Sequence, residues 1–390
     1  MSAASGGFGI DHLPYGVFSA DGKSPTVGIR YGDAVLDVAA ALPSYRELLE
    51  RPTLNELMAA GPASWDAVRA DVTDYLRAHP DSGQLLPVAD VALQLPIQVA
   101  DYVDFYASEH HAVNLGRLFR PDSEPLLPNW KHLPVGYHGR AGTVVATGSP
   151  VRRPQGQTKA PAASTPSFGP SQRLDIEAEV GFVVGVGSDR GTPVPATAFA
   201  DHVFGVCLVN DWSARDIQAW EYVPLGPFLG KSFATSMSGW ITPLAALQSA
   251  RVPAPARDVP VLDYLADDAG WGLDISLEVE WNGTVVSRPP FAGMYWTAAH
   301  MLAHMTCGGA SLRTGDLFAS GTVSGSDPAT VGSFIELSGG GNRPVTLTDG
   351  STRTFLQDGD TVVLRATAPS TGGGTISLGE VAGTVVPAAE

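Results

Sequence analysis

Glycine and proline are unusually frequent in this chain and limit the folds that it can adopt. The sequence contains 44 glycines and 31 prolines among 390 residues, without a collagen-like period. Because proline breaks helices and glycine weakens them, we expect many turns and few long helices. Hydrophobic residues make up 44% of the chain and charged residues 16%, which is typical of a protein with a folded core. The composition therefore predicts a mainly β globular protein.

The net charge and the cysteine content limit which partners the protein can bind and in which cellular environment it is expected. The chain carries a formal charge of −16, which repels phosphate backbones and anionic lipids, so we expect neither nucleic acid nor a membrane as a partner. The N-terminus has no basic and apolar leader, which predicts a cytoplasmic protein. Cys207 and Cys307 lie in apolar stretches, and we expect both to be reduced thiols in the core.

The periodicity of the apolar residues changes along the chain and indicates two domains. Alternating runs at residues 16–18 and 26–30 predict strands, and helical spacing over residues 45–79 predicts two short helices. The turn-rich residues 80–96 are typical of a linker, so we expect an N-terminal domain over residues 1–97 and a larger one over residues 98–390. The larger domain should contain strands at residues 142–146, 174–186, 274–281, 332–337 and 361–366, and a hairpin turn at Asn282 and Gly283.

One of these expected strands places two carboxylates on the same face. Glu177 and Glu179 alternate with apolar neighbours, so their Cα atoms lie about 7 Å apart along the strand. Such a pair can bind a metal ion. The same alternation occurs at Glu278 and Glu280, on a hairpin expected to be solvated. The pattern leaves metal binding and a plain solvated face both open.

A second segment combines an acid, a cation, an amide and a phenol at helical spacing. The intervals of four, three and four residues place them on one stripe, formed by Asp211, Arg215, Gln218 and Tyr222. Tryptophans lie near this stripe, and the Gly- and Pro-rich residues 224–230 follow it. The stripe can therefore face either a pocket or solvent.

Histidines supply two further candidates. If the segment is helical, Asp104 and His111 lie two turns apart on one face, where His111 can be a general base or a structural residue. His300 and His304 are four residues apart, but the glutamate of a zinc-protease motif is missing. We therefore expect His300 and His304 to lie in a helix that packs on the core.

Several motifs resemble those of the fumarylacetoacetase family. They are DYVDFY at 101–106, PNW at 128–130, HLPVGYHGR at 132–140, NDWSARDIQ at 210–218, WEYVPLGPFLGKSF at 220–233, GDLFASGT at 315–322 and FLQDGD at 355–360. Their order and spacing fit the family from about residue 98 to residue 387. The uninterrupted PLGPFLGK at 224–231 is highly specific.

The resemblance implies a fold and an activity. The fold would be a small N-terminal SH3-like β-barrel followed by a large C-terminal mixed β-sandwich roll, in a homodimer. The activity would be metal-dependent hydrolysis, with Mg²⁺ or Ca²⁺, of the carbon–carbon bond of 4-fumarylacetoacetate. The products would be fumarate and acetoacetate, at the end of tyrosine and phenylalanine catabolism.

The resemblance also implies roles for individual residues of this sequence. The divalent metal would be bound by the carboxylates of Asp104, Glu177, Glu179 and Asp211. A second, Mg²⁺-like site would involve Asp211, Thr235 and the backbone carbonyl of Lys231. His111 would be the base and Glu336 the acid that orients it. The oxyanion would be bound by Arg215, Gln218 and Lys231, and the substrate by Tyr106, Arg120, Tyr137, Gln218, Tyr222 and Thr322.

Two other functions are compatible with parts of this pattern. A related enzyme that hydrolyses an acylpyruvate, or that decarboxylates or hydrates a keto acid, would use the same metal with a different base. A binding module without catalysis would keep the carboxylates and lose the base or the oxyanion donors. The presence of both His111 and Glu336 favours hydrolysis.

Overall fold

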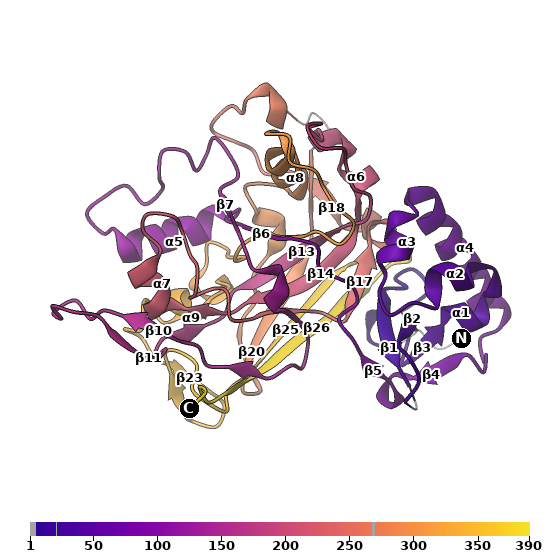
Figure 1. Ribbon diagram of the computed structural model, residues 1–390, viewed down its shortest axis with the longest axis horizontal. Coiled ribbons are helices and arrows are strands. Elements are labelled where there is room, and N and C mark those ends of the chain that lie inside the picture. Colours follow the sequence, from indigo (N-terminus) through magenta and orange to yellow (C-terminus); the bar gives the residue numbers. More distant parts are fainter. Residues whose placement is uncertain (1–4, 21, 267–269) are drawn as a thin grey trace.

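The computed structural model describes residues 5–20, 22–266 and 270–390, and it confirms the predicted mainly β class. Half of the described strands, 13 of 26, belong to one large sheet (Figure 1). Its strand order is β4 (Leu85–Pro87), β3 (Ala34–Asp37), β2 (Thr26–Tyr31), β1 (Tyr15–Ser19), β17 (Trp240–Pro243), β14 (Val203–Asp211), β13 (Ala178–Val184), β22 (Leu317–Ala319), β6 (Tyr102–Phe105) and β7 (Gly136–His138). Three more strands join beside this path: β5 (Ala92–Leu93), β8 (Val144–Ala146) and β16 (Thr235–Met237).

The N-terminal strands continue the sheet of the C-terminal region. Strand β1 pairs with β17 in an antiparallel register that sets Gly16 opposite Trp240. The turn-rich residues 80–96 are not a free linker, because β4 pairs with β3 and β5 pairs with β1. Strand pairing thus joins the N-terminal strands, at the right of Figure 1, to β17 and β14 in one sheet. An SH3-like barrel and a boundary near residue 97 stay predictions.

Helices cover the N-terminal part of this sheet. The prediction of two short helices over residues 45–79 is wrong, because the structure has α2 (Arg46–Leu49), α3 (Asn55–Ala59) and the 17-residue α4 (Pro62–Ala78). Proline is tolerated in the first turn of a helix, so Pro62 starts α4 instead of breaking it. Val68, Val72 and Leu76 of α4 are buried with the apolar side chains of β1 and β2.

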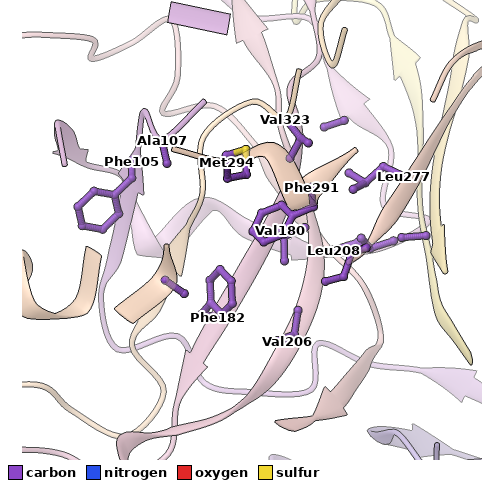
Figure 2. Packing of buried hydrophobic residues seen from close by; sticks show 14 of the residues in the cluster. Phe105, Ala107, Val180, Phe182, Val206, Leu208, Leu277, Phe291, Met294 and Val323 are labelled. Carbon is purple, nitrogen blue, oxygen red and sulfur yellow. The ribbon is translucent and has the colours of Figure 1, made fainter. Parts of the chain in front are cut away.

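A second sheet of five strands packs beside the first. Its order is β21 (Thr284–Ser287), β20 (Ser276–Trp281), β25 (Thr361–Pro369), β26 (Thr375–Val386) and β9 (Val151–Arg152). The predicted hairpin joins β20 to β21, and positive φ angles of 48° at Asn282 and 76° at Gly283 confirm its turn. Val180 and Phe182 of β13 and Leu277 of β20 belong to the same buried hydrophobic cluster (Figure 2).

Two predictions near the site need correction. The predicted strand at residues 332–337 is instead the short helix α9 (Phe334–Leu337), whose first backbone amides are bound by the side chain of Asp175. The predicted strand over residues 174–186 is divided into β12 (Leu174–Asp175) and β13. The break lets β12 pair with β15 (Ser213–Ala214), while β13 pairs with β14.

The cysteines differ from each other in burial. Cys207 is buried in β14, whereas Cys307 is exposed at the C-cap of α8 (Ala298–Thr306), so the prediction of two core thiols is wrong for Cys307. His300 is buried within α8, as predicted, and His304 on the next turn is only partly buried. Among the described residues, no helix is both long and apolar enough to cross a bilayer.

Candidate active site

Four carboxylates from neighbouring strands form one buried cluster. Asp104 lies on β6, Glu179 on β13 and Asp211 at the end of β14, and Glu177 immediately precedes β13. One carboxylate oxygen from each residue lies within 4.8 Å of the others, and all four residues are buried. Glu177 and Glu179 are therefore not on a solvated strand face. We call Asp104, Glu177, Glu179 and Asp211 the carboxylate cluster.

The elements that carry this site differ from the helical stripes predicted for it. Asp104 and His111 do not share a helix, because Asp104 is on β6 and His111 is on α5 (Glu109–Phe119). Asp211 is on a strand, and α7 (Arg215–Glu221) begins four residues later. The residues still meet because β14 and β6 lie in the same sheet, separated by β13 and β22.

Two cations neutralise one side of the carboxylate cluster. The Lys231 ammonium donates to Glu177 and lies 2.7 Å from Oδ2 of Asp211. The Arg215 guanidinium places Nη1 2.7 Å from Oε1 of Glu177. Burial alone would raise the pKa of Glu177, but the charges of Lys231 and Arg215 outweigh it and lower that pKa. Glu177 is therefore ionised at neutral pH.

The other side of the cluster has no such partners. Oδ1 of Asp104 and both carboxylate oxygens of Glu179 are buried without a hydrogen-bond partner in the part of the chain that the structure describes. Burial and the nearby negative charge of Asp211 raise the pKa of Asp104, and burial with the charge of Asp104 raises that of Glu179. Unpaired oxygens in an all-carboxylate cluster suit a hard divalent cation. The residues present therefore fit a Mg²⁺ or Ca²⁺ ion.

The side chain of Asp211 is held by three donors in all. Besides Lys231, it accepts a hydrogen bond of 2.7 Å from the Tyr137 hydroxyl and one of 3.1 Å from Oγ1 of Thr235. Thr235 is directly opposite Asp211 in the pairing of β16 with β14. Lys231 and Thr235 thus contact Asp211 through their side chains, whereas the resemblance assigned the backbone carbonyl of Lys231 to a second metal site.

His111 and Glu336 form a buried pair next to this cluster. Nδ1 of His111 lies 2.7 Å from Oε2 of Glu336, and their side chains are 2% and 1% exposed. The Glu336 carboxylate also accepts hydrogen bonds from Asn114 (2.9 Å), Ser324 (3.0 Å) and Ser333 (2.7 Å). Burial would raise the pKa of Glu336, but the charge of His111 and these hydrogen bonds outweigh it and lower that pKa.

This network has a chemical consequence. An ionised Glu336 only accepts hydrogen bonds, so Nδ1 of His111 carries the proton in this contact, and Nε2 is the ring nitrogen that Glu336 does not engage. Asn114, Ser324 and Ser333 were not recognised from the sequence. Asn114 is 222 positions from Glu336 in the sequence and belongs to no recognised motif. Its contact with Glu336 can therefore be identified only in the folded structure.

Of the residues expected to bind substrate, Tyr106 packs against the pair, and two others have buried polar atoms without a partner among the described residues. The Tyr106 ring packs edge-on against the His111 imidazole, with ring centroids 5.3 Å apart. Oγ1 of Thr322 and Nε of Arg120 are buried, and neither has a hydrogen-bond partner among the described residues. These two unpaired polar atoms are available to a ligand. Arg120 is held by a 2.8 Å hydrogen bond from Nη2 to the carbonyl of Pro125.

The remaining candidates lie on α7. Oε1 of Gln218 is 3.4 Å from Nη1 of Arg215, so both side chains are on the same side of the helix. Tyr222 is at the C-cap of α7 and its residue is 45% exposed. Tyr222 is therefore the most exposed of the predicted substrate contacts.

A buried carboxylate cluster that fits a divalent metal lies beside an oriented histidine, and this arrangement suits an enzyme of the hydrolase class. The chain belongs to the fumarylacetoacetate hydrolase family, because the model described as "Fumarylacetoacetate (FAA) hydrolase C-terminal" matches residues 101–386. The model "Fumarylacetoacetase N-terminal" matches residues 11–96. The chain is 43% identical to fumarylacetoacetase of Rattus norvegicus over 405 residues, covering 98% of this chain and 96% of that protein. It is 40% identical to fumarylacetoacetase of Arabidopsis thaliana, covering 97% and 96%.

Solved structures show the same fold at much lower identity. A fumarylacetoacetate hydrolase from Exiguobacterium antarcticum superposes with a TM-score of 0.59 and 18% identity, covering 96% of this chain and 99% of that one. Maleylpyruvate hydrolase from Sphingobium, in complex with manganese(II) and pyruvate, gives a TM-score of 0.54 at 15% identity, covering 97% and 100%.

Proposed function

We propose that this protein hydrolyses the carbon–carbon bond of 4-fumarylacetoacetate to fumarate and acetoacetate, in the last step of tyrosine and phenylalanine catabolism. The observation that carries the proposal is the burial of the His111–Glu336 pair next to the carboxylate cluster. A base, fixed cations and a metal site are the groups that cleavage of a 1,3-diketone requires. The 43% identity to fumarylacetoacetase over 98% of the chain supports this substrate.

His111 is the proposed general base. Its Nε2 takes a proton from water while the water oxygen attacks a substrate carbonyl. Glu336, bound to Nδ1 at 2.7 Å, stabilises the imidazolium that forms. The bond between the attacked carbon and its neighbour then breaks, and the electron pair leaves with acetoacetate as an enolate. The imidazolium returns the proton to the neighbouring carbon, which left as the enolate, while the attacked carbon becomes the new carboxyl group of fumarate, so the reaction consumes one water.

Arg215, Gln218 and Lys231 are the proposed donors to the oxyanion. Nη2 of Arg215 supports this role, because it is buried and has no hydrogen-bond partner within the described ranges. The other nitrogens of the guanidinium are held by Asp175 and Glu177, so its position is fixed before substrate binds. A donor oriented in advance stabilises developing charge without reorganisation.

The carboxylate cluster is the proposed site of Mg²⁺ or Ca²⁺. The unpaired oxygens of Asp104 and Glu179 support it, as does the manganese(II) in maleylpyruvate hydrolase of the same fold. A bound divalent cation supplies charge that polarises the diketone and stabilises the departing enolate. A second, Mg²⁺-like site would use Asp211, Thr235 and the backbone carbonyl of Lys231.

Six residues are the proposed substrate contacts. Arg120 would bind a carboxylate of the substrate, because guanidinium groups form charge-assisted hydrogen bonds with carboxylates. The buried, unpaired Nε of Arg120 and Oγ1 of Thr322 support this placement. The full proposed set is Tyr106, Arg120, Tyr137, Gln218, Tyr222 and Thr322.

A homodimer is the proposed assembly. Apolar residues in the segment after α7 face outward, with Leu225 96% exposed and Phe228 63% exposed. An apolar surface of this kind is typical of an interface between subunits. The cytoplasmic location expected from the sequence stays a prediction.

The test is an assay of the purified protein on fumarylacetoacetate. We expect chelation to abolish activity and Mg²⁺ or Ca²⁺ to restore it, because the carboxylate cluster offers oxygen ligands alone. An acylpyruvate is assayed in parallel. Turnover of the acylpyruvate but not of fumarylacetoacetate would disprove the proposed substrate, and full activity in verified metal-free protein would disprove the metal's role.

A further inference from the structure

Asp175 is a buried carboxylate to which neither the sequence motifs nor the proposed reaction assigns a role. It is on β12, fully shielded from solvent. Its oxygens accept four hydrogen bonds, from the backbone amides of Ile176 (2.8 Å), Phe334 (2.7 Å) and Ile335 (3.0 Å) and from Nε of Arg215 (2.8 Å). A buried carboxylate with this many donors is rigid.

One side of Asp175 holds the proposed oxyanion donor. Nε of Arg215 donates to Oδ2 of Asp175, and Nη1 donates to Glu177. The guanidinium is planar, so two fixed nitrogens determine where the third one points. That third nitrogen, Nη2, is the buried atom without a hydrogen-bond partner among the described residues. Asp175 therefore sets the direction of Nη2.

The other side of Asp175 holds the segment that carries the acid of the base pair. Phe334 and Ile335, whose amides bind Asp175, are the first two residues of α9, and Glu336 follows directly. Oε2 of Glu336 in turn accepts from Nδ1 of His111. A shift of the backbone at residues 334–335 would therefore move the carboxylate that orients His111.

We propose that Asp175 is a positioning residue that holds Arg215 and the His111–Glu336 pair in one fixed arrangement. It does not touch the reacting atoms and acts through Arg215 and α9. The inference rests on the proposed function of these two groups. Its physical basis is that a catalytic group misplaced by about 1 Å can cost about 10²-fold in rate.

The test compares two buried aspartates by the same substitution. Asp175→Asn keeps the size of the side chain but replaces one acceptor oxygen by an NH2 donor. This donor then faces another donor, either Nε of Arg215 or the backbone amides of α9. Asp360→Asn is the matched control, because Asp360 is 3% exposed and accepts from Gln357 N, Asn282 Nδ2 and the side chain of Arg353, none of which is proposed for catalysis.

We expect Asp175→Asn to lower kcat by about 10²-fold with KM changed less than about 3-fold. Asp360→Asn should lower Tm comparably and leave kcat within about 3-fold of wild type. In a His111→Ala, Arg215→Gln background, Asp175→Asn should add less than about 3-fold, because the groups that it positions are gone. A further loss of about 10²-fold in that background would overturn the proposal.

Two further measurements keep the test decisive. If Asp175→Asn does not fold, Asp175→Glu retains the charge but is one methylene longer, and it should also lower kcat by at least about 10-fold. Wild-type kcat in either folded variant would overturn the inference. Crystal structures of wild type and variant compare the positions of Arg215 and Glu336 without any assay. If the wild-type protein does not hydrolyse fumarylacetoacetate, the proposed function is wrong. If Arg215 and Glu336 keep their positions in the variant's crystal structure, the positioning role is refuted independently of the function.

Discussion

Replacing His111 with alanine removes the proposed base and leaves the carboxylate cluster in place. General-base catalysis contributes about 10²–10⁴-fold to rates, so kcat for fumarylacetoacetate should fall by that factor. Binding of Mg²⁺, measured by titration calorimetry, should persist because the four carboxylates of the cluster do not include His111. This pair of readouts separates loss of the base from loss of the site.

The contribution of Glu336 can be worked out from its hydrogen bonds. The 2.7 Å contact with His111 is buried and charge-assisted, and a hydrogen bond to a charged group is worth about 1.5–3 kcal/mol. At about 1.36 kcal/mol for each factor of ten, loss of this contact lowers kcat by roughly 10- to 150-fold. Glu336→Gln should therefore cost less than His111→Ala. Glutamine keeps the size of glutamate, so the fold should be retained.

The double variant tests whether the two residues act as one unit. In a His111→Ala background, Glu336→Gln should change kcat by less than about 3-fold, since there is no imidazolium left to stabilise. Multiplicative losses would refute the proposed pairing and show independent roles. An unimpaired His111→Ala variant would place the base elsewhere, and His110 would be examined next.

Three further predictions follow from the structure. Glu179→Gln should weaken Mg²⁺ binding by at least about 10-fold in titration calorimetry, whereas Glu280→Gln, which pairs with Arg365 instead, should leave it unchanged. Leu225→Asp should convert a dimer to a monomer in light scattering, and an unaltered mass would refute the proposed interface. Burial lowers the pKa of His12 to about 3, below the 6.5 of an unfolded histidine, so the stability that it contributes is present above about pH 6.5 and is lost as pH falls toward 3. Calorimetry at pH 7 and pH 5 should show a smaller acid destabilisation in His12→Gln than in wild type, by up to about 2 kcal/mol.

Local sequence patterns correctly predicted those elements of the fold that depend only on residues adjacent in the sequence. The turn at Asn282 and Gly283 was predictable because both residues accept the positive φ that a tight hairpin needs. The strand at residues 332–337 was predicted wrongly, since its helical conformation depends on Asp175, which is 159 positions away from Phe334. The helical stripe predicted from Asp211 to Tyr222 was wrong for Asp211, which is on a strand. Asp211 is in a strand because β14, which ends at this residue, pairs with β13 and β16.

The sequence by itself determined which chemical groups this protein has and which of them share a strand face. Glu177 and Glu179 alternate with apolar residues, and so do Glu278 and Glu280. Only the tertiary structure decided which pair lies in a buried carboxylate cluster. Glu177 and Glu179 are buried where strands of the large sheet bring Asp104 and Asp211 beside them, whereas Glu278 and Glu280 stay partly exposed and pair with arginines. The physical reason is that the charge state and use of a carboxylate depend on burial and on neighbouring charges, which come from segments distant in sequence.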